Sequence, residues 1–156
     1  LEEDPRIARQ VPMELLEKMR IQGDVIVRRA EPSQPDENAP WLLDITGPDM
    51  SLLIGRRGET LNALQYIARL ITSRRLQRRA NIIVDAGGYK SQRSQRLRQL
   101  AKRMADQAVQ QSRTIYLEPM PPNERRIIHL ALRDREDVET RSTGEGDTRK
   151  VTIVPK

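Results

Sequence analysis

The feature that most restricts the fold of this chain is the run Gly55-Arg56-Arg57-Gly58, which separates two apolar segments. Two glycines three positions apart let the backbone turn sharply, because neither carries a Cβ atom. Apolar residues at 52–54 predict a short helical turn before the run, and the periodicity of 59–76 predicts a longer helix after it. A phosphate could then approach the backbone and the positive start of the following helix. Since an ordinary turn has the same composition, the surrounding elements must decide between the two interpretations.

Those surroundings predict a defined order of helices and strands over the first half of the chain. Periodicity indicates a helix at 5–20, strands at 24–30, 41–46 and 82–85, and a proline-rich loop at 32–40. The order helix–strand–strand–helix–loop–helix–strand resembles the type II KH domain, whose Gly-x-x-Gly loop clamps about four nucleotides. The type I order would place one strand before the loop segment and two after it. We therefore expect a three-stranded sheet with its helices on one face.

The second half of the chain predicts another small unit. We take Gly87-Gly88 as the boundary and expect domains at 1–87 and 88–156. A helix at 89–112, a strand at 115–117, a proline-bounded helix ending near 133 and a hairpin with strands at 138–141 and 149–154 follow. The expected fold class is α+β, with helices packed on a small three-stranded sheet in this domain as well.

The predicted helix near 121–133 carries an Arg and a His one turn apart. Arg125 and His129 are spaced i, i+4 and therefore project side by side, and Arg133 continues the same face. Arg126 lies at the edge of this face, and the apolar set placed on the opposite side is Ile127, Ile128, Leu130 and Ala131. A guanidinium and an imidazole at this spacing can hold a phosphate between them. The alternative is an ordinary surface histidine, with Arg125 paired to Glu124 or Asp134.

The charge of the chain is concentrated in blocks. The net charge is +6, and 23 of the 28 basic residues are Arg. Residues 54–79 and 89–113 each carry a net +6, whereas residues 1–53 carry a net −5. Basic blocks in an otherwise neutral or acidic chain favour attraction to a polyanion, although codon preference would also produce an Arg surplus.

Composition also excludes several classes of protein. The absence of Cys and the single His rule out disulfides and disfavour a metal site. No segment approaches the length of a membrane span, and no secretory signal is recognisable, so we expect a cytoplasmic protein. The acidic residues are scattered, so we expect no enzyme activity, no cofactor, no metal and no small-molecule substrate. Because the chain begins at Leu1, we expect a fragment or a processed chain.

The combination of the two modules resembles the Jag family of bacteria, also called KhpB or SpoIIIJ-associated protein. The resemblance covers nearly the whole chain and is carried by LIGRRGETLNALQYI, YKSQRSQRLRQLAKRM and EPMPPNERRIIHLAL. It identifies the second module as an R-three-H domain, named for its invariant Arg and His. It implies an RNA chaperone or post-transcriptional regulator linked to cell wall, cell shape and sporulation. It further implies a small KH-domain partner, association with a YidC-type membrane insertase, and an N-terminal Jag domain and linker that are absent from this sequence.

Binding of single-stranded RNA is the leading hypothesis. The predicted contacts are Ile54, Gly55, Arg56, Arg57 and Gly58 in the first domain, and Arg125, Arg126, His129 and Arg133 in the second. An apolar groove would come from residues near Ile54 and Leu61, and the absence of Phe disfavours base stacking on aromatic pairs. The alternative is an interaction adaptor docked on an insertase or a partner KH protein. Discrimination between RNA and DNA, and dimerisation of the KH module, are left open.

Overall fold

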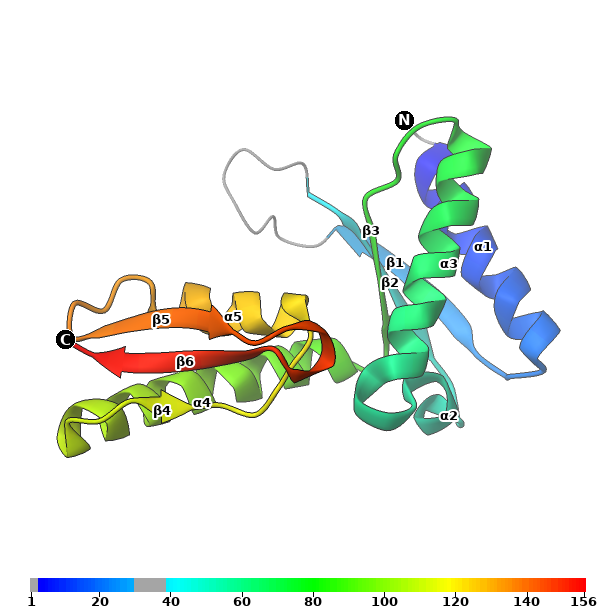
Figure 1. Cartoon of the computed structure of the whole chain (residues 1–156). Coiled ribbons are helices and arrows are strands. Elements are labelled where there is room, and N and C mark those ends of the chain that lie inside the picture. The colour runs from blue at the N-terminus through cyan, green and yellow to red at the C-terminus, as the bar shows by residue number, and fades with distance from the viewer. Residues whose placement is uncertain (1–2, 30–38) are drawn as a thin grey trace. The chain divides into compact units, whose positions relative to one another are not determined.

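The protein is described by a computed structural model that covers residues 3–29 and 39–156. Its contacts divide it into two compact units, Leu1–Lys90 and Ser91–Lys156 (Figure 1). Each unit has a hydrophobic core of its own. The loop expected at 32–40 lies almost entirely outside the described residues.

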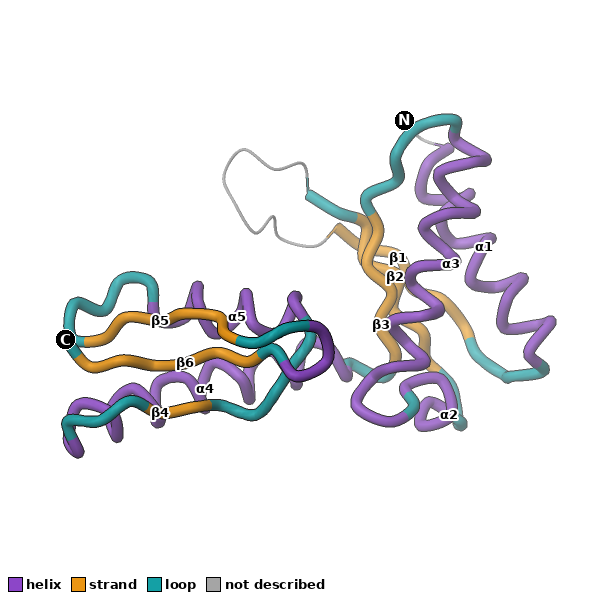
Figure 2. The backbone as a smooth tube through the Cα atoms, viewed as in Figure 1, coloured by secondary structure: helices purple, strands orange, loops and turns teal. Residues whose placement is uncertain are grey.

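The first unit is a three-stranded sheet with two long helices packed on it. Strand β1 pairs antiparallel with β2, and β2 pairs parallel with β3, so that β3 is an edge strand. Helices α1 and α3 contact each other and the strands, and they lie on the same side of the sheet (Figures 1 and 2). The elements in chain order are α1 (Glu3–Met19), β1 (Asp24–Arg29), β2 (Trp41–Thr46), α2 (Met50–Ile54), the 3-10 turn η1 (Arg56–Gly58), α3 (Glu59–Leu76) and β3 (Ile82–Ala86).

Hydrophobic burial at helical and strand spacing explains this arrangement. Leu61, Leu64 and Ala68 of α3 are buried at i, i+3 and i+7, which places one stripe of the helix on the sheet. Leu43 and Ile45 of β2 are fully buried beneath it. The helix begins at the η1 turn and thus holds the Gly-x-x-Gly run at one end of the unit.

Side chains of α3 cover the free edge of strand β3. The Val84 N–H donates to Gln65 Oε1 at 2.9 Å, and an Arg69 guanidinium nitrogen donates to the Ile82 carbonyl at 2.9 Å. An exposed strand edge is a template for unwanted pairing, and polar side chains that bond to it prevent that. After β3, the buried Asp85 carboxylate accepts from the N–H groups of Ala86 and Lys90, which closes the turn into the next helix.

The second unit packs two helices against a sheet of order β4-β6-β5 in which both pairings are antiparallel. Leu97, Ala101, Ala105 and Ala108 form a fully buried stripe on α4, and Ile128 and Leu132 of α5 join them in the core. The elements are α4 (Tyr89–Gln111), β4 (Ile115–Tyr116), α5 (Pro122–Leu132), β5 (Val138–Thr143), the 3-10 turn η2 (Gly146–Thr148) and β6 (Lys150–Pro155).

The expected fold class is confirmed: the chain is α+β, with a three-stranded sheet in each unit. The Gly87-Gly88 pair forms the turn between β3 and α4, and both glycines have positive φ. The boundary between the two compact units falls a few residues later in the chain, between Lys90 and Ser91. The domain limits at 87 and 88 remain a prediction.

Candidate nucleic-acid interface

The backbone at Gly55-Arg56-Arg57-Gly58, called the hinge loop below, turns through three residues of positive φ. Gly55 has φ 68° and ψ −170°, a conformation that is essentially restricted to glycine. Arg57 (φ 55°, ψ 27°) and Gly58 (φ 77°, ψ 13°) follow in the left-handed helical region. A helical residue followed by a left-handed one, as at Arg56 and Arg57, is the pattern of an anion-binding nest of backbone N–H groups. This backbone geometry can therefore present N–H groups to an anion.

Both glycines of the hinge loop are also required by their neighbours. A Cβ atom at Gly55 would overlap the Thr60 hydroxyl, and one at Gly58 would lie 2.8 Å from Cε1 of the Tyr89 ring. Gly58 is buried, and the Tyr89 ring packs partly on the core of the first unit. The aromatic ring thus supports the loop from within, while the Arg56 and Arg57 side chains are exposed.

Of the two residues expected to mark an apolar groove beside the hinge loop, only one is accessible. Ile54 is half-buried against the core, as a groove residue could be. Leu61 is completely buried, so its proposed place in the groove was wrong. The reason is that Leu61 occupies the stripe of α3 that packs onto the sheet, which leaves none of its surface for a ligand.

A polar cluster lies farther along α3, where it meets strand β3. The Lys90 ammonium donates to Gln65 Oε1 at 2.5 Å, on the oxygen that also accepts from Val84. The pKa of Lys90 is lowered to about 8, mainly by burial; the Asp85 carboxylate opposes the shift, and the Arg69 charge adds to it. The pKa of Lys90 thus lies well below the usual value for a lysine.

In the second unit, the lone histidine lies between a helix and a strand. His129 Nδ1 lies 2.7 Å from the Thr140 hydroxyl, and Nε2 lies 2.8 Å from the Ser142 hydroxyl. Thr140 and Ser142 are two residues apart along β5, so both project toward α5. A hydroxyl can donate or accept, so the pair can bond the neutral and the charged imidazole alike. We call the set Arg125, His129, Thr140, Ser142 and Arg149 the histidine face.

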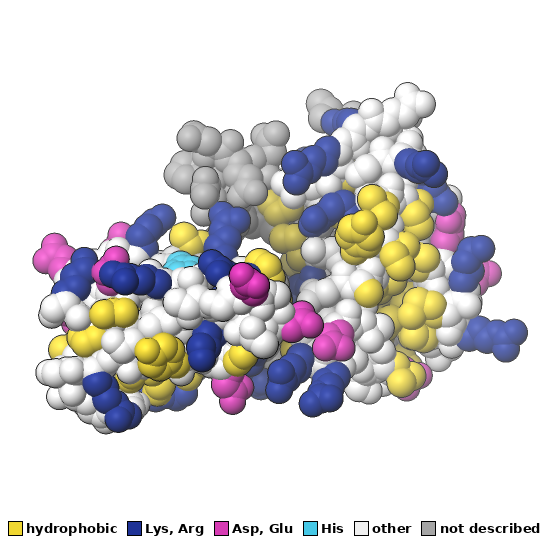
Figure 3. Space-filling model, in the orientation of Figure 1, with side chains coloured by type: hydrophobic (Ala, Val, Ile, Leu, Met, Phe, Trp, Pro, Cys, Tyr) yellow, Lys and Arg dark blue, Asp and Glu magenta, His cyan; other side chains and the backbone are white. Residues whose placement is uncertain are grey.

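The charges of the histidine face are mainly basic. The pKa of His129 is lowered by burial and then by the charges of Arg125 and Arg149. The Arg125 guanidinium donates to the Met120 carbonyl at 3.1 Å, and that of Arg149 donates to the Gly144 carbonyl at 2.7 Å. Figure 3 shows the imidazole reaching the surface beside basic side chains. An anion bound between Arg125 and Arg149 would relieve the repulsion among these positive charges.

The other residues predicted for this face lie apart from it. Arg126 is exposed, and Arg133 is exposed at the end of α5, where it lies 3.6 Å from the Asp134 carboxylate. Arg125 and His129 are half-buried rather than freely exposed. The helix spacing therefore brings together Arg125 and His129, as expected, but does not bring Arg133 into the same hydrogen-bonded group.

The opposite side of α5 departs from the prediction in two ways: one residue of the predicted apolar set is exposed, and Glu124 is paired with another arginine. Leu130 is 38% exposed and does not belong to the core, whereas Leu132 is buried. The buried stripe follows 124, 128 and 132, because the sheet covers that line of the helix. Glu124 on this stripe accepts two hydrogen bonds from Arg93 of α4, at 2.9 and 3.2 Å, so the alternative pairing of Arg125 with Glu124 is wrong.

Sequence reasoning missed several residues of both sites. Thr140, Ser142 and Arg149 come from the hairpin, and Tyr89 joins the surroundings of the hinge loop only through tertiary packing. The alternation of strand β5 could have placed Thr140 and Ser142 on one face, but the sequence contains no sign that this face meets His129.

Neither a metal site nor a membrane-spanning helix is found among the described residues. No group of three or more His, Asp or Glu side chains in residues 3–29 and 39–156 is arranged to hold a metal ion. None of the helices described there is both long and apolar enough to cross a membrane.

Comparison with known families gives one match for each unit. The model of the KhpA/KhpB KH domain matches residues 14–84, and the model of the R-three-H domain matches residues 95–155. The hinge loop falls inside the first match, and the histidine face falls inside the second. The resemblance to the Jag/KhpB family is thus confirmed by both modules in the expected order.

Curated relatives support the same assignment. The chain is 43% identical to the RNA-binding protein KhpB of Bacillus subtilis over 114 residues, which cover 72% of this chain and 55% of that protein. It is 40% identical to the RNA-binding protein KhpB of Clostridium symbiosum over 111 residues, which cover 71% of this chain and 50% of that protein. The chain spans about half the length of these relatives. It belongs to the KhpB family, in which a KhpA/KhpB KH domain is followed by an R-three-H domain.

Proposed function

We propose that this chain binds single-stranded RNA through the hinge loop and the histidine face. The observation that carries the proposal is the left-handed backbone of the hinge loop, with two exposed arginines at the start of an 18-residue helix. Backbone N–H groups, the helix N-terminus and two guanidinium groups all favour a phosphate at this point. The names of the relatives, which are RNA-binding proteins, support RNA as the polyanion.

The histidine face supplies a second phosphate contact in this proposal. Arg125 and Arg149 provide charge, while Thr140 and Ser142 orient the imidazole. Contacts to the phosphate backbone confer strong salt dependence and little sequence preference. We therefore expect modest specificity, a binding role without catalysis, and a cytoplasmic location where RNA is available.

The experiment is a filter-binding assay with labelled oligoribonucleotides. Replacing Arg56→Asp and Arg57→Asp together should abolish binding and preserve the fold, because Asp tolerates the left-handed conformation at residue 57. The matched control is Lys18→Asp with Arg20→Asp, which changes the charge equally at the exposed end of α1. Unchanged affinity of the hinge-loop variant, or equal loss in the control, would refute a role for the hinge loop. A DNA oligonucleotide of the same sequence tests the preference for RNA.

A protein partner is the second candidate, and an exposed apolar face of α3 favours it. Tyr66, Ile67 and Leu70 are 65%, 44% and 52% exposed at helical spacing, and Figure 3 shows hydrophobic side chains gathered over this unit. Exposed apolar patches commonly mark protein contacts. We propose that this face binds another KH domain, either a small KH protein or a second copy.

Sedimentation of the chain alone and with a stand-alone KH protein tests this candidate. Leu70→Glu should abolish any association, and Leu52→Glu is a control because Leu52 is also exposed but lies on α2. The roles as an RNA chaperone and in cell-wall and cell-shape control, and the association with a membrane insertase, rest on the family resemblance alone.

A further inference from the structure

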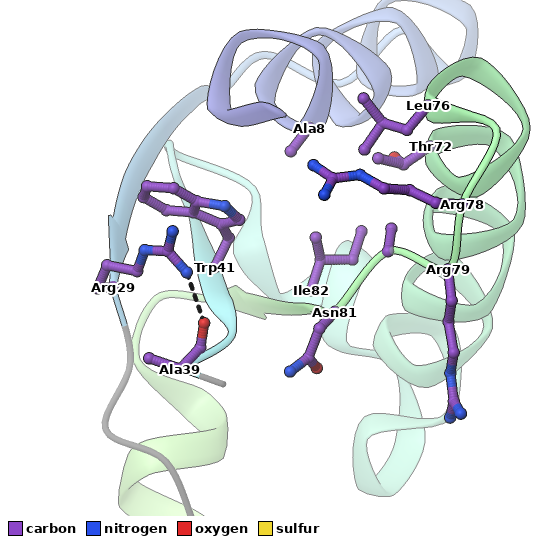
Figure 4. Close-up of a pocket in the computed structure, with 11 residues that line it drawn as sticks. Ala8, Arg29, Ala39, Trp41, Thr72, Leu76, Arg78, Arg79, Asn81 and Ile82 are labelled. Atoms are coloured by element: carbon purple, nitrogen blue, oxygen red, sulfur yellow. Dashed lines mark hydrogen bonds between the residues drawn. The ribbon is translucent and has the colours of Figure 1, made fainter. Parts of the chain in front are cut away.

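A cavity of about 310 Å³ opens in the first unit at the end opposite the hinge loop. It lies between the C-terminal end of α3, the first residues of β2 and β3, and α1 (Figure 4). The hinge loop precedes the first residue of α3, and this cavity lies at its last turn. The helix rise of 1.5 Å per residue separates the two by about 26 Å. The cavity is therefore a separate place on the unit.

The walls of this cavity favour an anion. Three arginines, Arg29, Arg78 and Arg79, contribute to its lining, and none of its described lining residues is acidic. The Arg78 side chain extends into the cavity in Figure 4, whereas the Arg79 side chain runs along α3 and its guanidinium lies away from the other lining residues. The charge offered to a ligand is therefore assigned to Arg29 and Arg78.

One wall also offers a surface for a planar ring. The Arg29 guanidinium stacks on Trp41 with its Cζ atom 3.7 Å from the ring centroid, and one of its nitrogens donates to the Ala39 carbonyl at 2.7 Å. The hydrogen bond keeps the guanidinium plane in place over the indole. Guanidinium and indole planes are both surfaces on which nucleobases stack.

A buried hydroxyl in the same cavity has no partner among the described residues. Thr72 is fully buried, its Oγ1 atom makes no hydrogen bond there, and the residue lines the cavity. A buried hydroxyl without a partner destabilises a fold, so such groups are rare without a reason. A polar ligand group entering the cavity would satisfy it.

We propose that this cavity binds a single nucleotide, with the base on the Arg29–Trp41 stack, a base-edge group near Thr72 Oγ1 and the phosphate on Arg78. The volume is at the lower end of the range for small-ligand pockets, which suits one nucleotide rather than several. The nucleotide is either free or part of an RNA strand. The proposal rests on the proposed RNA binding only in the second case.

Trp41 makes the test direct, because it is the single tryptophan of the chain. The whole protein is titrated with uridine and adenosine monophosphate while Trp41 fluorescence is excited at wavelengths where nucleotides do not absorb. A saturable change is expected with either nucleotide, whereas inorganic phosphate, which has no ring to stack, should leave the emission unchanged. No change at millimolar nucleotide would overturn the proposal.

Variants locate the bound nucleotide. Arg29→Gln and Arg78→Gln should each weaken nucleotide binding at least about five-fold, consistent with the loss of one stacked or ionic contact. Arg20→Asn removes the same charge from the end of α1 and should have no effect. Thr72→Val is the decisive variant: it should make the protein more stable yet weaken nucleotide binding. A Val variant that binds as tightly as the parent protein would remove Thr72 from the site, and equal weakening by Arg20→Asn would refute a specific pocket.

Two further arms separate this proposal from the proposed RNA binding. The Arg56→Asp and Arg57→Asp variant should still show the fluorescence change with a monophosphate, even if it no longer retains RNA on a filter. If the nucleotide belongs to an RNA strand, an oligouridylate should change the Trp41 emission, and Arg29→Gln should weaken its binding. If the site serves a free nucleotide, the monophosphate alone will act. Loss of the monophosphate response in the hinge-loop variant would contradict an independent pocket.

Discussion

Arg57 should reduce the stability of the first unit while it strengthens RNA binding. Its φ of 55° places a residue with a full side chain in the left-handed region, at a cost of about 1–2 kcal/mol. Asn occupies this region far more readily than Arg. We therefore expect Arg57→Asn to raise the free energy of unfolding by about 0.5–1 kcal/mol, and the β-branched Arg57→Val to lower it by about 1 kcal/mol or more.

The same substitution should have the opposite effect on RNA. The plot of log affinity against log salt has a negative slope. Removing one cation that contacts a phosphate of a single strand makes that slope less steep by about 0.7. Arg56→Asn is the matched control, since Arg56 has helical geometry and carries the same charge at the adjacent position. It should decrease the salt slope similarly, with a stability change within about 0.5 kcal/mol.

Urea unfolding followed by Trp41 fluorescence measures the stability of the first unit, and anisotropy of labelled RNA at several salt concentrations measures binding. With a slope of about 2 kcal/mol per molar urea, the Arg57→Asn midpoint should rise by roughly 0.3–0.5 M. An unfolding midpoint below that of the parent protein would refute the argument from backbone strain. An unchanged salt slope would show that the Arg57 side chain does not contact phosphate.

Three further predictions follow from individual side chains. Because the folded pKa of His129 is lowered, the free energy of unfolding should fall as pH decreases below about 6.5, and His129→Asn should remove this dependence in thermal unfolding followed by circular dichroism. RNA affinity should instead increase toward low pH, because a phosphate favours the charged imidazole. Lys90 should titrate near pH 8 in an NMR experiment on its side chain, and a midpoint above 10 would contradict its burial. Because its folded pKa is lowered, the free energy of unfolding should decrease as pH falls from about 10.4 through 8, and Lys90→Met should abolish this trend. Glu124→Gln should destabilise the second unit by about 1–2 kcal/mol in thermal melts, because it weakens a two-fold hydrogen bond to the half-exposed Arg93, and a neutral outcome would show that the pair contributes nothing.

The fold was largely predictable because its patterns are local. Turn glycines, proline at a helix start and hydrophobic spacing placed the described helices and strands close to where they occur, and the order of elements indicated the KH topology. Arg125 and His129 were placed on one face of α5 by helix spacing alone. Leu130 was misplaced because the period of a helix does not reveal which side the sheet will cover.

The candidate sites were only partly predictable. The sequence alone determined the hinge loop, the basic blocks and the Arg–His pair, since each depends on residues that are close together in the chain. Three sets of contacts appear only in the folded molecule: Thr140 and Ser142 bond the imidazole, Tyr89 supports Gly58, and Arg29, Trp41 and Thr72 line one cavity. These contacts join residues from different elements, and their geometry depends on strand register and helix packing, which arise from the whole core rather than from any single segment.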